Sequence, residues 1–114
     1  MPKSWVEAIA ERESQLGADA VARMATDFAE NAKVRLAAID AALTRHALAE
    51  VRQATHDLAA SAGSLCFHHL RVAAQDVEHA CDTDDCAGLP ALAAMLAPLV
   101  EMAIIQLRAR YGLT

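Results

Sequence analysis

The sequence predicts an all-α fold, an antiparallel up-down four-helix bundle with a short extra N-terminal helix. Hydrophobic residues make up 55% of the 114 residues and aromatic residues only 4%, and alanine, the best helix former, is the commonest residue. Glycine and proline, which interrupt helices, number only four and three. Apolar residues also recur at spacings of three and four, the period of an amphipathic helix.

A short helix and then a long one are expected at the N-terminal end. Ser4 and Glu7 have the spacing of a capping box, so a helix should begin there and end at Gly17. Asp19 can then cap the second helix. The inward positions of the first helix are Trp5, Ile9 and Leu16. Those of the second continue over about seven turns: Val21, Met24, Phe28, Ala32, Leu36, Ile39 and Leu43.

The middle of the chain predicts two more helices. The apolar phase resets at Leu48 after a weak break over residues 44–47, so a third helix should run from there to about Leu65. Its stripe is Leu48, Val51, Thr55, Leu58, Ala62 and Leu65. The fourth helix should turn inward Leu70, Ala73, Ala74, Val77 and Ala80.

A charged loop over residues 82–88 should separate the fourth helix from the last one. Pro90 suits the first turn of that last helix. Pro98 should kink or split this helix. Its stripe should be core, with Met95 and Met102 filling gaps, because an exposed apolar face would require a partner. That stripe is Leu92, Leu96, Leu99, Ala103, Ile104 and Leu107. The alternative arrangement is a pair of helical hairpins that forms a bundle only on dimerising.

The charge and the cysteine count exclude several classes of protein. The net charge of −5 and the lack of a basic face argue against a nucleic-acid binder. No polybasic run or signal peptide is visible, and the apolar run over residues 89–100 is short and interrupted by prolines, which argues against a membrane protein. Three cysteines do not suggest a disulfide framework. We expect one cytoplasmic domain over residues 1–114, monomeric, without nucleic acid or membrane as partner.

His56 is the residue that points most clearly to a chemistry. Positions three, four and seven apart share a helix face, and around His56 this face carries mostly small side chains. The ring lies roughly 130° from the middle of the apolar stripe, so it should face solvent. A neutral imidazole can accept a phosphoryl group and pass it on. The neighbours are Ala49, Arg52, Gln53, Ala59, Ala60 and Gly63.

Residues 55–70 read THDLAASAGSLCFHHL, which resembles the motif of the histidine-containing phosphotransfer (HPt) domain, roughly A-H-x-L-K-G-S-A-G-x-x-G-x-x-x-L. His56 falls on the phosphorylated histidine, and the similarity extends from Phe28 to the fourth helix. Five further positions agree: Leu58, Ser61, Ala62, Gly63 and Leu70.

The resemblance implies a phosphoryl carrier in a two-component phosphorelay. His56 would accept the group from the receiver domain of a hybrid histidine kinase, or from another receiver, and pass it to a response regulator. The chain would need no cofactor, since Mg²⁺ and the acceptor aspartate belong to the receiver, and it would be no enzyme with its own turnover. The expected docking patch consists of Ala49, Gln53, Ala59, Ala60, Gly63 and Ser64.

The chain departs from this motif at three positions. Ala59 replaces the lysine, Ala60 a glycine and Cys66 a later glycine. Ala60 leaves room for a partner, and we expect Cys66 only to lengthen a helix end. The lost lysine matters most, because a cation would favour the negative charge of the phosphoryl group. Arg52, one turn before His56, is the expected substitute.

Two alternative functions stay open. The first is a non-catalytic, degenerate bundle that docks on a receiver or kinase and regulates it. The second is a metal-binding bundle that uses His79, Cys81, Cys86 and the acidic residues at 82–85, although this spacing matches no standard structural zinc site. His68 and His69 could border the docking surface or act as a second acceptor, but we expect one to face solvent and one to be partly buried.

Overall fold

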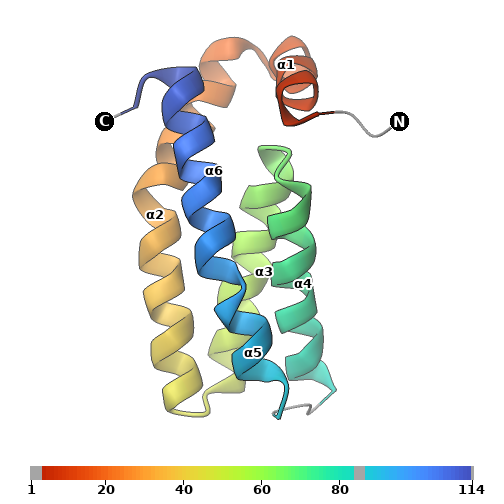
Figure 1. The fold of residues 1–114 in the computed structure, drawn as a ribbon, viewed down its shortest axis with the longest axis vertical. Coiled ribbons are helices and arrows are strands. Elements are labelled where there is room, and N and C mark those ends of the chain that lie inside the picture. The colour runs from red at the N-terminus through yellow and green to blue at the C-terminus, as the bar shows by residue number, and fades with distance from the viewer. Residues whose placement is uncertain (1–3, 84–86, 114) are drawn as a thin grey trace.

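The computed structural model describes residues 4–83 and 87–113, which fold into helices joined by short turns. Four rods, formed by α2, α3, α4 and the pair α5–α6, run alternately up and down, and α1 lies across one end of them (Figure 1). The expected all-α bundle with an extra N-terminal helix is therefore confirmed. The helices are α1 (Trp5–Leu16), α2 (Ala18–Thr44), α3 (Leu48–Ser64), α4 (His68–Asp82), α5 (Leu89–Ala94) and α6 (Leu96–Tyr111).

The start of α1 follows the capping box. Oγ of Ser4 accepts a hydrogen bond from the backbone N–H of Glu7 at 3.2 Å. The expected cap at Asp19 is wrong, because Gly17 both ends α1 and begins α2, which leaves Asp19 inside the first turn. Leu16 is also exposed rather than inward, since the bundle does not cover the last turn of α1.

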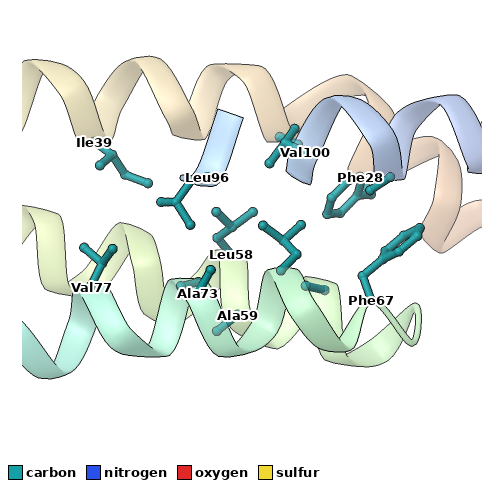
Figure 2. Close-up of a cluster of buried hydrophobic side chains, with 14 of the residues drawn as sticks. Phe28, Ile39, Leu58, Ala59, Phe67, Ala73, Val77, Leu96 and Val100 are labelled. Carbon is teal, nitrogen blue, oxygen red and sulfur yellow. The ribbon is translucent and has the colours of Figure 1, made fainter. Parts of the chain in front are cut away.

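One core runs the length of the bundle and holds α1 at its end (Figure 2). The rings of Trp5 and Phe67 stack at 5.2 Å, and Phe28 packs on Phe67 at 5.8 Å. The indole N–H of Trp5 also donates to the carbonyl of Leu65 at 2.9 Å. Most of the residues expected to face inward are buried; those that are only half-buried are Trp5, Met24, Leu36, Leu43, Leu48, Leu92 and Leu99.

The turns after α2 and α3 share one geometry. His46 and Cys66 have positive φ angles of 54° and 66°, the left-handed conformation that favours glycine. Each turn is closed by a bond across five residues, from Ala47 N–H to Ala42 and from Phe67 N–H to Ala62. Cys66 therefore ends α3 rather than lengthening it, and our expectation for this residue was wrong.

Pro98 splits the last rod, as expected. The residue has no N–H to donate to Ala94, the last residue of α5, and α6 begins two residues before the proline. By length and composition Leu89–Tyr111 could cross a membrane, a test that the core helix of a soluble bundle also passes. The expectation that Met95 and Met102 fill core gaps is wrong, because both side chains are exposed.

Candidate functional site

The imidazole of His56 projects from the middle of α3. Its neighbour Thr55 is fully buried, with Oγ1 donating to the carbonyl of Val51 at 2.8 Å, and Leu58 is buried in the core. Because these two residues fix the inner face of α3, His56 faces outward. Its side chain is 63% exposed, as the spacing predicts.

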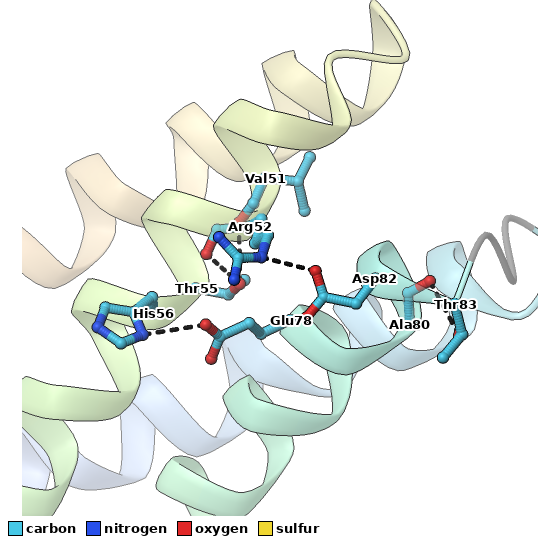
Figure 3. A network of polar contacts seen from close by, with 8 residues as sticks. All are labelled: Val51, Arg52, Thr55, His56, Glu78, Ala80, Asp82 and Thr83. Atoms are coloured by element: carbon cyan, nitrogen blue, oxygen red, sulfur yellow. Dashed lines mark hydrogen bonds and ion pairs between the residues drawn. The ribbon is translucent and has the colours of Figure 1, made fainter.

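Glu78 of α4 is the direct partner of His56. One carboxylate oxygen, Oε2, lies 3.0 Å from Nδ1 of the ring (Figure 3). The Glu78 side chain is only 20% exposed, so the carboxylate is held between the helices. When Nδ1 carries the proton and donates to Glu78, the lone pair of the neutral ring lies on Nε2. In that tautomer Nε2 is the nucleophilic atom and faces away from Glu78.

Arg52 lies one turn before His56, where the sequence places it, but its charge is shared. Its Nε donates to Oδ1 of Asp82 on α4 at 2.7 Å, and Figure 3 shows the guanidinium directed at that carboxylate. About half of each side chain is exposed. A phosphoryl group on His56 would therefore compete with Asp82 for this cation.

Three contacts between α3 and α4 follow a single register. The pairs His56–Glu78, Arg52–Asp82 and Gly63–Arg71 each lie equally far before and after Phe67 in the sequence. Two antiparallel helices that meet at a short turn bring such residues to the same height. Our reading of the sequence missed Glu78 and Asp82, although this symmetry about the turn would have identified both.

The surface of α3 around His56, here called the floor, carries mainly small side chains, but one residue expected in the docking patch is missing from it. Ala49 and Ala60 are exposed, as are Gln53 and Ser64. Ala59 is 5% exposed and does not belong to the docking patch. Its side chain turns into the seam between α3 and α4, because α4 packs against that flank of α3.

A cation borders the floor on each side. On the α4 side, Cδ of Arg71 would lie 3.0 Å from a Cβ atom placed on Gly63, so the arginine crosses α3 at this glycine. Its guanidinium contacts Nδ1 of His68 at 2.8 Å. On the α2 side, Arg35 donates to Oγ of Ser61 at 2.7 Å. Neither arginine was singled out from the sequence, because only tertiary packing brings them beside α3.

The residues of the metal alternative are only partly visible. Cys86 and the acidic residues 84 and 85 lie outside the described residues. Among residues 4–83 and 87–113, no group of three or more His, Cys, Asp or Glu side chains could hold a metal ion. His68 and His69 are both exposed, so the expectation that one is partly buried is wrong.

A model of the Hpt domain family matches residues 23–110, which include α3, α4 and all of the site. The chain belongs to the Hpt domain family. Searches of curated proteins and of solved structures gave no match. Membership supports a histidine phosphotransfer role in two-component signalling and implies interaction with receiver domains and histidine kinases.

The Hpt assignment and the geometry concern the same helices. The match begins within α2 and ends near the last turn of α6, so it covers the four rods and excludes α1. Within those rods His56 is an exposed imidazole bonded to a carboxylate over a floor of small side chains. This Hpt domain therefore carries a ring that is oriented, accessible and chemically able to accept an electrophile.

Proposed function

We propose that this Hpt domain relays a phosphoryl group between receiver aspartates through Nε2 of His56. The group comes from the receiver of a hybrid histidine kinase and passes to a response regulator. The observation that carries the proposal is the contact of 3.0 Å between His56 Nδ1 and Glu78 on a ring that is open to solvent. The proposed site of action is the cytoplasm.

The chemistry of each transfer balances without another reactant. Nε2 attacks the phosphorus of an aspartyl phosphate, a P–N bond forms, and the P–O bond breaks to release the aspartate carboxylate. The proton on Nδ1 stays in place, so the phosphorylated ring is cationic, and the Glu78 carboxylate stabilises that charge. The second transfer reverses these bonds on another receiver. Mg²⁺ belongs to the receiver, and the chain has no turnover of its own.

Positioning supplies most of the catalysis in this proposal. Phosphoryl transfer requires the donor and acceptor to be in line, with charge stabilised around the phosphorus. The small side chains of Ala49 and Ala60 let a receiver approach Nε2. Arg52 is the cationic residue nearest to His56 in the sequence. In the unphosphorylated protein its guanidinium is paired with Asp82.

A phosphotransfer assay tests the proposal. Purified receiver domains, radiolabelled on aspartate by their kinases, are incubated with the wild-type chain, with His56→Gln, and with His69→Gln as the matched control. We expect acid-labile, base-stable label on the wild type and on His69→Gln, and none on His56→Gln. Label on His56→Gln would overturn the assignment of the acceptor.

A second candidate function is a docking module that carries no phosphate. The observation in its favour is the charge near His56: a lysine is missing at Ala59, and the nearby cation, Arg52, is paired with Asp82. In the same assay this alternative predicts that a receiver binds the wild type, measured by calorimetry, while no label transfers. That result would overturn the relay in favour of the docking module.

A further inference from the structure

Gly63 of α3 makes room for the side chain of Arg71 of α4. A Cβ atom placed on Gly63 would lie 3.0 Å from Cδ of Arg71 and 3.9 Å from its Cγ, so the stem of the arginine crosses α3 where this glycine has no side chain. Seven residues separate His56 from Gly63, which places the glycine about 11 Å further along α3 and only about 20° round the helix. Arg71 therefore borders the same face of α3 as His56, two turns away.

The guanidinium of Arg71 is held by neutral partners. Its Nη2 donates to Nδ1 of His68 at 2.8 Å, and its Nη1 donates to Oε1 of Gln75 at 3.4 Å. Arginine has no acceptor, so Nδ1 of His68 must accept, and that ring is neutral. In the part of the chain that the structure describes, no ion pair joins Arg71 to a carboxylate, whereas Arg52 is paired with Asp82. Half-buried Arg71 thus presents a fixed positive charge that no bonded carboxylate offsets.

The surroundings of His56 are otherwise rich in acidic side chains. Asp57 and Asp82 are exposed, and the carboxylate of Glu78 lies beside the ring. A phosphorylated receiver is negative at its acceptor as well, because an acyl phosphate dianion with a carboxylate ligand outweighs the charge of Mg²⁺. Like charges on two approaching surfaces repel, and this chain has a net charge of −5. A cation on the border of the face therefore offsets part of that repulsion.

We propose that Arg71 is a specificity-determining residue of the relay: it binds a carboxylate of the receiver close to the phosphorylated aspartate, and Gly63 lets it lie in position. The inference rests on the proposed function, since it names the chemistry that the docking face selects in its partner. The dimensions agree with this role. A protein partner typically covers about 800 Å² of surface, a disc of about 16 Å radius, and such a disc centred on His56 includes Arg71.

Arg35 and Arg52, which also border α3, are less suited to this role. Arg35 donates to Ser61, which lies about 140° round the helix from His56, so this arginine stands on the flank toward α2. Arg52 is closer to His56, but its guanidinium is bonded to Asp82. The arginine of α4 is better placed, because it borders the His56 face and its hydrogen-bond partners are neutral.

Single-turnover transfer from a radiolabelled receiver, measured over a range of receiver concentrations, tests the proposal. We expect Arg71→Ala to raise the half-saturating receiver concentration roughly fivefold at about 0.1 M NaCl and to leave the maximal rate unchanged. At about 1 M NaCl, where charges are screened beyond about 3 Å, this difference should vanish. Arg71→Lys should restore most of the wild-type behaviour. The matched control is Arg108→Ala, an exposed arginine of α6, because α6 does not contact α3 in the described residues.

A double-mutant cycle tests the part assigned to Gly63. Gly63→Ala removes no charge, but its new methyl group should displace the arginine and raise the half-saturating concentration. In the Arg71→Ala background, Gly63→Ala should have no further effect. An equal effect in both backgrounds would show that the methyl group obstructs the receiver directly, which contradicts the role given to Gly63. Circular dichroism checks that every variant keeps its helix content.

Phosphoramidate, a phosphoryl donor too small to need docking, separates docking from chemistry. Its labelling of His56 and the lifetime of the phosphohistidine should not respond to Arg71→Ala. A loss of either, or an unchanged half-saturating concentration, would overturn the proposal. If the wild type binds a receiver but takes no label, the relay alone fails, and calorimetry of Arg71→Ala decides: a Kd roughly fivefold higher supports the inference, and an unchanged Kd refutes it. A wild type that neither binds nor takes label overturns both.

Discussion

Glu78 of α4 holds Nδ1 of His56 of α3 at 3.0 Å, and the carboxylate is much less exposed than the ring. We expect the acid to act through the imidazole, by fixing its tautomer and orientation, because its carboxylate lies mostly covered beside the ring and out of reach of a bulky receiver. Its role differs from that of the missing lysine, which would act on the phosphoryl group itself.

Removing the Glu78 carboxylate should slow phosphotransfer. Glu78→Ala frees the ring to rotate and to carry its proton on either nitrogen, so we expect the transfer rate to fall roughly tenfold or more. Glu78→Gln keeps an oxygen acceptor but loses the charge, and its rate should lie in between. Rapid-quench kinetics with a labelled receiver measures both. Glu30→Ala, an exposed glutamate of α2, is the control; a Glu78→Ala rate equal to that control would remove the positioning role.

Breaking the Arg52–Asp82 pair should change the lifetime of the phosphohistidine. Asp82→Asn releases Arg52 toward the phosphoryl group, so the lifetime should lengthen a few-fold, and Arg52→Ala should shorten it and slow the transfer. The decay of label on the isolated chain gives the lifetime. Arg45→Ala, which breaks another exposed pair, with Glu50, should have no effect. The idea that Arg52 compensates for the lysine is wrong if Arg52→Ala alters neither the rate nor the lifetime.

Replacing Cys66 by glycine should stabilise the bundle. Its φ of 66° is strained for a residue with a side chain, and glycine relieves a cost of about 1 kcal/mol. Urea denaturation should show the free energy of unfolding rising by about that amount. Cys66→Ala keeps the Cβ atom and should not show the gain, so equal effects of the two substitutions would contradict the explanation.

The cluster that ties α1 to α6 should make stability depend on pH at both extremes. Hydrogen bonds from Arg110 and then Tyr111 lower the pKa of Glu13, so its contribution is complete above the ordinary carboxylate range and is lost as pH falls through the lowered pKa. Burial, followed by the bond to Glu13, raises the pKa of Tyr111 to about 12.

At alkaline pH the dependence is opposite: the stability falls as pH rises. The Tyr111 contribution is complete below a pH of about 10 and is lost as pH rises toward 12. Thermal melting across pH should show both slopes. Glu13→Gln should flatten the acid slope and Tyr111→Phe the alkaline slope, relative to the wild type. An unchanged acid slope in Glu13→Gln would assign that slope to other carboxylates.

The sequence predicted the rods because helix periodicity is a local property. It also placed His56 correctly, since Thr55 and Leu58 define the inner face of α3. The sequence-based prediction failed where packing between helices determines which side chains are covered. Ala59 is covered because α4 lies on its side of α3, which no count along a single helix can show. Cysteine itself does not signal a left-handed turn, but the HPt motif has a glycine at the position of Cys66, and we did not read that glycine as the sign of a positive φ.

The partners of the site also required a tertiary rule. Glu78 lies on another helix, and only its distance from Phe67 along the chain connects it to His56. The exposed side chains of Met95, just before α6, and Met102 were misjudged because the pattern along one helix does not show which of its faces the neighbouring helices cover.

The shared register about Phe67 makes the length of the turn between α3 and α4 a functional constraint. One inserted or deleted residue there would shift α4 by about 1.5 Å and rotate it by about 100°, which would withdraw Glu78, Asp82 and Arg71 from α3 together. Substitutions at single positions remove one contact each. Lineages that keep this chemistry should therefore keep the residue count of the turn fixed, even where they replace one side chain in it by another that the core and the positive φ of Cys66 accept.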